Sequence, residues 1–189
     1  MKTIRAFIAI DLDERLKREL AHLQEKLKAA EADVKWVAPK NLHLTLKFLG
    51  EILPTQIDDV ESAMIRTAGS FSTFHMDVGE LGAFPNKTTP EIIWAGVTKR
   101  LNLLLDISRY LDEELSDIDI AEEKRAFTAH ITLGRLKKPA KDHRLAELLT
   151  NTHIPSGVSQ KVERLTLFRS DLFSTGAQYE ILSHARLNA

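Results

Sequence analysis

The pattern His43-Leu44-Thr45-Leu46 recurs in the second half of the chain as His130-Ile131-Thr132-Leu133, and this repeat decides the fold that we expect. Finding His, an apolar residue, Thr and Leu in this order twice by coincidence has a chance below roughly one in a thousand. Strand residues two positions apart project from the same face. Each copy therefore predicts a strand with a histidine and a threonine on one face and apolar residues on the other.

The residues after the first copy extend the same alternation. Lys47 follows on the face of His43 and Thr45, which makes it a candidate for binding an anionic substrate or else a solvated surface charge. The opposite face, expected to pack into a core, carries Leu42, Leu44, Leu46 and Phe48. Two strands that each have one polar and one apolar face indicate that their polar faces line opposite walls of a cleft.

Strand and helix patterns alternate along the whole chain. The expected strands are residues 4–10, 42–49, 74–82, 91–97, 127–136, 159–169 and 178–187, and the expected helices are residues 13–30, 54–69, 99–116 and 142–151. Several neighbouring strands are too close for parallel crossovers, which need about a dozen residues or more. We therefore expect an α+β fold in which residues 1–189 form a single bilobal domain. Its two pseudo-symmetric lobes would have mainly antiparallel sheets flanked by helices, with both motifs in a central cleft.

The composition narrows the class of protein. The chain of 189 residues contains no cysteine, which removes disulfides and thiolate metal ligands and is compatible with a cytoplasmic location. Its apolar runs are too short for a signal peptide or a membrane span, so we expect no membrane association. The net charge is −1, from 26 basic and 27 acidic residues. A protein that coats long nucleic acid would be basic, so an RNA substrate would be held through a few phosphates only.

The paired motifs indicate acid–base chemistry. Two histidines can supply a general base and a general acid near neutral pH, and two threonines can donate hydrogen bonds. These groups suffice to cleave a phosphodiester without a metal or another cofactor. The motifs could instead be the polar sides of two amphipathic strands, since threonine favours strands, or ligands of a metal. The remaining histidines lack the pattern and are expected to be structural or exposed: His22, His75, His143, His153 and His184.

The chain resembles a known family over nearly its whole length. The residues that carry the resemblance are Phe7–Ile10, Val34–Val37, Asn41–Glu51, Phe84–Asn86, Ile92–Val97, Phe127–Arg135 and Leu167–Leu182. They are similar to the RNA 2′,3′-cyclic phosphodiesterases, also called 2′-5′ RNA ligases, of the two-histidine phosphoesterase superfamily. One departure is Ala129, where many members have proline before the second histidine.

The resemblance implies a role for each motif residue. His43 would be the proton donor to the leaving 3′-oxygen, and His130 would be the proton acceptor that activates water. Thr45 and Thr132 would bind the phosphate oxygens. Arg135 would add a cation, although a regular strand would point it away from His130 unless Gly134 marks a bulge or the strand end.

Further candidates line the expected cleft. Phe7 could offer a surface on which a base stacks, or could be a buried strand residue. Arg169, Ser170 and Tyr179 match the C-terminal pattern of the family.

The implied activity is metal-independent hydrolysis of RNA 2′,3′-cyclic phosphate ends to 2′-phosphates, with weak reverse 2′-5′ ligation. Halves of cleaved tRNA are the substrate that the family suggests, and we expect a cytoplasmic monomer without a protein partner. Two alternatives remain open: a related phosphodiesterase that acts on a small cyclic nucleotide or an oligonucleotide end, and an RNA-binding scaffold without turnover.

Overall fold

The computed structural model describes residues 3–121, 126–138, 142–173 and 176–189. Its strands are β1 (Ile4–Asp11), β2 (Val34–Trp36), β3 (His43–Ile52), β4 (Phe74–Phe84), β5 (Ile92–Val97), β6 (His130–Leu136), β7 (Ser159–Val162), β8 (Arg164–Phe173) and β9 (Gly176–Arg186). Its helices are α1 (Glu14–Lys28), α2 (Ile57–Gly69), α3 (Leu101–Ser116) and α4 (His143–Asn151), with short 3₁₀ helices η1 (Pro39–Asn41) and η2 (Pro54–Gln56). Most of the expected elements are confirmed, but the strand expected at residues 159–169 is two strands, because β7 pairs with β4 whereas β8 pairs with β1 and β9. The sequence patterns also missed the short strand β2 and the two 3₁₀ turns.

The strands form a curled antiparallel arrangement with two halves. Their order is β7-β4-β5-β6-β3-β1-β8-β9, and β2 pairs with the free side of β6. The halves meet where β3 and β6 pair through Leu44 and Ile131, which are the middle residues of the two motifs. The α+β class with two pseudo-symmetric lobes is therefore confirmed, and both motifs lie at the junction of the halves.

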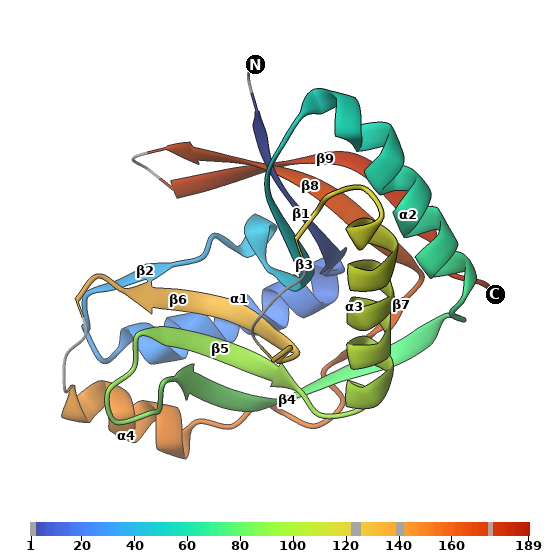
Figure 1. The fold of residues 1–189 in the computed structure, drawn as a ribbon. Coiled ribbons are helices and arrows are strands. Elements are labelled where there is room, and N and C mark those ends of the chain that lie inside the picture. The colour runs from blue at the N-terminus through green and yellow to red at the C-terminus, as the bar shows by residue number, and fades with distance from the viewer. Residues whose placement is uncertain (1–2, 122–125, 139–141, 174–175) are drawn as a thin grey trace.

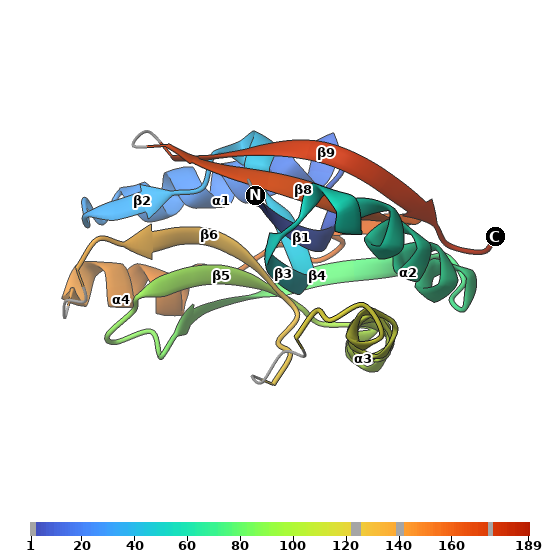
Figure 2. The ribbon, with the colours of Figure 1, turned by 45° about the horizontal axis from the view of Figure 1, so that its top comes forward.

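Helices α1 and α3 each cover the half of the sheet opposite to the strand that they follow. Helix α1 follows β1 but packs with α4 on the side of β6, whereas α3 follows β5 and packs with α2 on the side of β3 (Figures 1 and 2). Helix α1 begins at Asp13, whose carboxylate accepts a hydrogen bond from the Leu16 backbone N–H at 2.7 Å. Its leucines 16, 20, 23 and 27 are buried, as their helical spacing predicts.

Both motif strands contain a β-bulge immediately after the threonine. In β3, Thr45 pairs with Ala9 and Lys47 with Ile8, so Leu46 is the extra residue. In β6, Thr132 pairs with Trp94 and the next pair joins Gly134 to Ile93, which leaves Leu133 extra. A bulge reverses the alternation of the side chains beyond it.

A buried side chain on the covering helix stabilises each bulge. The Ser108 hydroxyl on α3 donates to the Leu46 carbonyl at 2.9 Å. The Gln24 amide on α1 donates to the Leu133 carbonyl at 2.8 Å. Because an unpaired buried carbonyl is unfavourable, these contacts tie the geometry of each motif to the helix behind it. Within the described residues, no helix is long and apolar enough to cross a membrane.

Candidate active site

The two motif histidines begin β3 and β6 and have the same local geometry. His43 Nδ1 lies 2.7 Å from the Asn41 carbonyl oxygen, and His130 Nδ1 lies 2.7 Å from the Thr128 carbonyl oxygen. A carbonyl oxygen only accepts, so each Nδ1 carries the proton and donates it. In the neutral ring, Nε2 is then the basic nitrogen, which is the requirement for a general base or, once protonated, a general acid.

The threonines lie beside the histidines, as their spacing predicts. The Thr45 Oγ1 is 3.1 Å from His43 Nε2, so the hydroxyl donates to the neutral ring. Thr132 is half-buried and pairs with Trp94 on the neighbouring strand. Thr45 therefore has its hydroxyl group next to Nε2 of its histidine, and Thr132 holds the equivalent position in β6.

Aromatic rings from β1, β8 and β9 enclose His43. The centroid of its ring is 4.7 Å from Phe7, 6.1 Å from Phe168 and 5.2 Å from Tyr179, which meets it edge-on. Phe7 is only 3% exposed and stacks on Phe168 at 5.2 Å. The prediction that Phe7 stacks on a base is wrong, because its ring is covered and instead supports the imidazole of His43.

His130 lies against a smaller aromatic group. Phe84 meets it edge-on at 5.2 Å, and the ring of Trp94 lies 6.4 Å away. The Trp94 ring lies over Gly82, where an added Cβ would come within 2.2 Å of the ring. Glycine at position 82 therefore makes room for the tryptophan that supports the second histidine.

Burial lowers the pKa of both histidines. For His43, desolvation lowers the pKa, the hydrogen bond to Asn41 and the charge of Asp11 raise it, and the charges of His130 and Lys17 lower it. For His130, desolvation and the charge of Arg135 lower the pKa, while the hydrogen bond to Thr128 raises it. The two rings belong to strands that pair through Leu44 and Ile131, the residues directly after the histidines.

Arg135 lies on the face of His130 because of the bulge at Leu133. Its charge lowers the pKa of both His130 and Tyr179, so it acts across both halves of the site. The bulge that the glycine at position 134 suggested is therefore present, and it turns the guanidinium toward the histidine.

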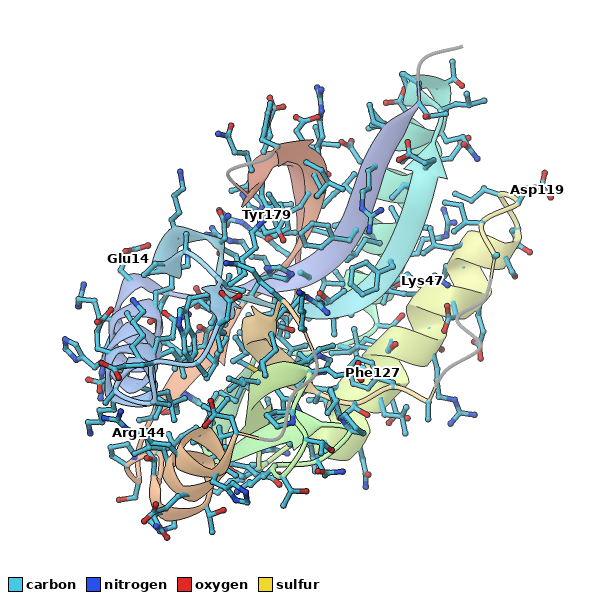
Figure 3. The ribbon with its side chains drawn as sticks, turned by 90° about the vertical axis from the view of Figure 1, so that its left-hand side faces the viewer. Glu14, Lys47, Asp119, Phe127, Arg144 and Tyr179 are labelled. Carbon is cyan, nitrogen blue, oxygen red and sulfur yellow. The ribbon has the colours of Figure 1, made fainter. Side chains whose placement is uncertain are left out.

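Lys47 neither faces the cleft, where it could bind an anionic substrate, nor lies on the solvated surface. The bulge at Leu46 turns its side chain onto the helix side of the sheet, where it is 2% exposed (Figure 3). Its ammonium pairs with Asp112 on α3 and donates to the Ala121 carbonyl at 2.6 Å. Lys47 therefore holds α3 against β3 and does not face a substrate.

Phe48 was expected on the apolar face of β3, in the core, and this prediction is also wrong. The same bulge brings it to the face of His43, where it is 53% exposed and 6.1 Å from Phe7. It occupies the position in β3 that Arg135 occupies in β6, five residues after each histidine. An exposed ring here can stack on a nucleobase of any identity. Sequence reasoning missed Phe48, because nothing in the sequence after Thr45 signals the bulge that brings its ring to this face.

The C-terminal candidates divide into near and remote groups. Tyr179 lies against His43, and desolvation raises its pKa. Arg169 contacts the carboxylates of Asp171 at 3.1 Å and Glu180 at 3.7 Å, and Ser170 is buried. Tyr179 is thus the only one of these three placed against a motif residue by the described contacts.

A cavity of about 290 Å³ opens on the side of His43 that faces η1 and β9. It is lined by Asp11, Lys17, Lys40, Asn41, Leu42, His43, Phe168, Gln178, Tyr179 and Ile181. In the parts of the chain that the structure describes, no group of three or more His, Asp or Glu side chains is arranged to hold a metal ion.

A pseudo-twofold pair of His-x-Thr strands, with both histidines fixed through Nδ1, defines a two-histidine phosphoesterase. The chain belongs to the LigT-like phosphoesterase family, whose family model matches residues 10–94 and 98–179.

The comparisons with individual proteins agree with this assignment. The chain is 34% identical to the RNA 2′,3′-cyclic phosphodiesterase of Methanothermobacter thermautotrophicus, over 97% of this chain and 99% of that protein. It is 33% identical to the enzyme of the same name from Thermotoga maritima, over 95% and 93%. A crystal structure from Thermus thermophilus matches with a TM-score of 0.81 at 28% identity, over 98% of this chain and 99% of that chain.

Proposed function

We propose that this chain hydrolyses the 2′,3′-cyclic phosphate at the end of an RNA to a 2′-phosphate, by two-histidine acid–base catalysis without a metal. Relatives that carry the name RNA 2′,3′-cyclic phosphodiesterase over nearly the full length support the substrate. The observation that carries the mechanism is the shared geometry of His43 and His130, whose Nδ1 atoms donate to the carbonyls of Asn41 and Thr128. Both rings therefore offer Nε2 to one substrate.

The proposed reaction breaks one bond and forms another. Neutral His130 takes a proton from water through Nε2, and the water oxygen bonds to phosphorus. The bond from phosphorus to O3′ breaks, and protonated His43 gives its Nε2 proton to O3′. The lowered pKa of His130 favours its neutral form, which is the form that a base needs. The bound phosphate anion favours the protonated form of His43, which is the form that an acid needs.

Thr45, Thr132 and Arg135 would hold the phosphoryl oxygens, whose charge needs preorganised donors. Running the reaction backwards with an RNA 5′-hydroxyl in place of water gives a 2′-5′ linkage. Weak ligation therefore requires no additional residues. Halves of cleaved tRNA, which end in such a cyclic phosphate, fit the same chemistry.

The test is incubation of a short RNA bearing a 2′,3′-cyclic phosphate with the pure protein in excess EDTA, followed by separation of 2′- from 3′-phosphate products. His43→Ala and His130→Ala should each lower the rate about 10²- to 10⁴-fold. His75→Ala, which changes an exposed histidine on β4, is the control. Absence of the 2′-phosphate, or full activity in both motif variants, would overturn the proposal. Activity that EDTA abolishes and added divalent metal restores would overturn metal independence.

A further inference from the structure

The two histidines face different residues on the neighbouring strands. Asp11 at the end of β1 is the register partner of His43, whereas Gly96 on β5 is the register partner of His130. Partners across an antiparallel pair project to the same side of the sheet. The register partner of His43 therefore carries a carboxylate, whereas the partner of His130 is a glycine over which the Glu80 side chain of β4 lies. The charge that acts on the pKa of His130 is the cation of Arg135. This asymmetry distinguishes two sites that are nearly identical in sequence.

Asp11 is held in place by contacts from two other elements. The Gln160 amide on β7 donates to the Asp11 carbonyl at 3.1 Å, and the Lys17 ammonium on α1 lies 3.0 Å from its carboxylate. The side chains of Asp11 and Lys17 are 22% and 10% exposed, and both line the cavity next to His43. A carboxylate in this partly buried setting acts more strongly on a neighbouring ring than one in water.

We propose that Asp11 is a positioning residue that favours a proton on His43 against the effect of burial and so assigns it the role of general acid. The proposal rests on the proposed function, in which one histidine must be protonated while the other is neutral. Asp11 touches neither the substrate nor the reacting atoms and acts through His43.

The charged groups around His43 come from several elements. Asp11 on β1 favours the imidazolium, while Lys17 on α1 and His130 on β6 oppose it. Lys40 on η1 shares the cavity, and Tyr179 on β9 lies edge-on to the ring. Among these groups, Asp11 is the charge that raises the pKa of His43, and its partner Lys17 has the opposite effect.

The proposal makes opposite predictions for the two partners of one ion pair. In Asp11→Asn, the pH optimum of kcat/KM should move to lower pH, because His43 loses its proton more readily. The ratio of alkaline-limb to acidic-limb activity should fall at least about threefold. In Lys17→Met, the optimum should move to higher pH. A purely structural ion pair would reduce activity in both variants at every pH, without moving the optimum.

The matched control is Glu14→Gln. Glu14 is the second carboxylate near Lys17, at 3.6 Å, and it is 79% exposed and absent from the cavity lining. This variant removes the same charge as Asp11→Asn and should leave the pH profile unchanged. Asp11→Glu should restore part of the profile, because it returns the carboxylate.

A second measurement follows the proton on His43 directly, by NMR titration of its ring in each variant. The titration midpoint should fall in Asp11→Asn, rise in Lys17→Met and stay constant in Glu14→Gln. A midpoint that does not move in Asp11→Asn would overturn the proposal, even if the enzyme is active. If the wild type makes no 2′-phosphate, the proposed function fails, and the titration still decides whether Asp11 controls His43.

Discussion

Leu44 and Ile131 pair with each other across β3 and β6, and this contact joins the two halves of the protein. Each lies between the histidine and the threonine of its motif, and both are completely buried. The pairing places the two motifs on either side of the pseudo-twofold axis. The relative placement of the two motif histidines therefore follows from the pairing of these two buried residues.

The bulges should be needed for catalysis as well as for stability. Ser108→Ala removes the hydroxyl that donates to the Leu46 carbonyl, and it should lower the free energy of unfolding by about 1–3 kcal/mol. It should also lower kcat, because Thr45 precedes the bulge. Urea unfolding and steady-state kinetics measure both effects. The control is Ser62→Ala, an exposed helical serine that donates to its own helix at 2.9 Å. Equal effects of the two substitutions would contradict this prediction.

Lys47→Met should reduce stability more than substrate affinity. The ammonium is buried against Asp112, and loss of the pair should lower the free energy of unfolding by about 3–5 kcal/mol. KM should stay within about twofold of the wild-type value, since the side chain faces α3. Lys161→Met, which removes an exposed pair with Glu163, should leave the free energy of unfolding almost unchanged. A large rise in KM for Lys47→Met would mean that the ammonium reaches the substrate.

Arg135→Gln should weaken substrate binding and shift the pH profile. The guanidinium lowers the pKa of His130, so its removal raises that pKa and moves the acidic limb of kcat/KM to higher pH. Loss of a charge-assisted contact to phosphate should raise KM about tenfold. Kinetics from pH 5 to pH 9 test both effects. Lys137→Gln, just beyond the end of β6, removes an exposed cation paired with Asp33 and should change neither quantity.

Phe48→Ala should raise KM for RNA substrates about 5- to 100-fold, since stacking on an aromatic ring contributes about 1–3 kcal/mol per base. Stability should change little, because the ring is already 53% exposed. The matched control is Ile65→Ala on the outer face of α2, which is 62% exposed. The change in KM should be compared for a cyclic mononucleotide and an oligonucleotide, because this shows whether the terminal base or a preceding base stacks on Phe48. Unchanged KM for both substrates would exclude Phe48 from binding.

Stability should fall as the pH decreases below the ordinary histidine range. Burial lowers the folded-state pKa of both His43 and His130, so the unfolded chain binds protons first. The stability that these rings contribute is fully present above about pH 6.5 and is lost as the pH falls through the folded-state values. Urea unfolding at pH 7.5 and pH 5.5 should show a smaller loss in His43→Gln than in the wild type. If His75→Gln reduced the loss of unfolding free energy between the two pH values as much as His43→Gln does, the effect would not be specific to the buried histidine.

The faces of the motif residues as far as each threonine followed from the sequence alone. A period of two places His43 with Thr45 and His130 with Thr132 in any regular strand, and local sterics alone enforce that period. The helices were equally readable, since the buried leucines of α1 recur at helical spacing. The family resemblance then implied the role of each motif residue.

Beyond each threonine, the tertiary structure determines which side chains face the cleft. Whether Lys47 or Phe48 faces the cleft depends on the bulge at Leu46, and that bulge is stabilised by Ser108, which is distant in the sequence. Gly134 hinted at a bulge in β6, and no comparable signal exists in β3. The difference between Asp11 beside His43 and Gly96 beside His130 likewise follows from strand register. Local sequence fixes which residues alternate, and only long-range hydrogen bonds fix where the alternation shifts and which charges meet.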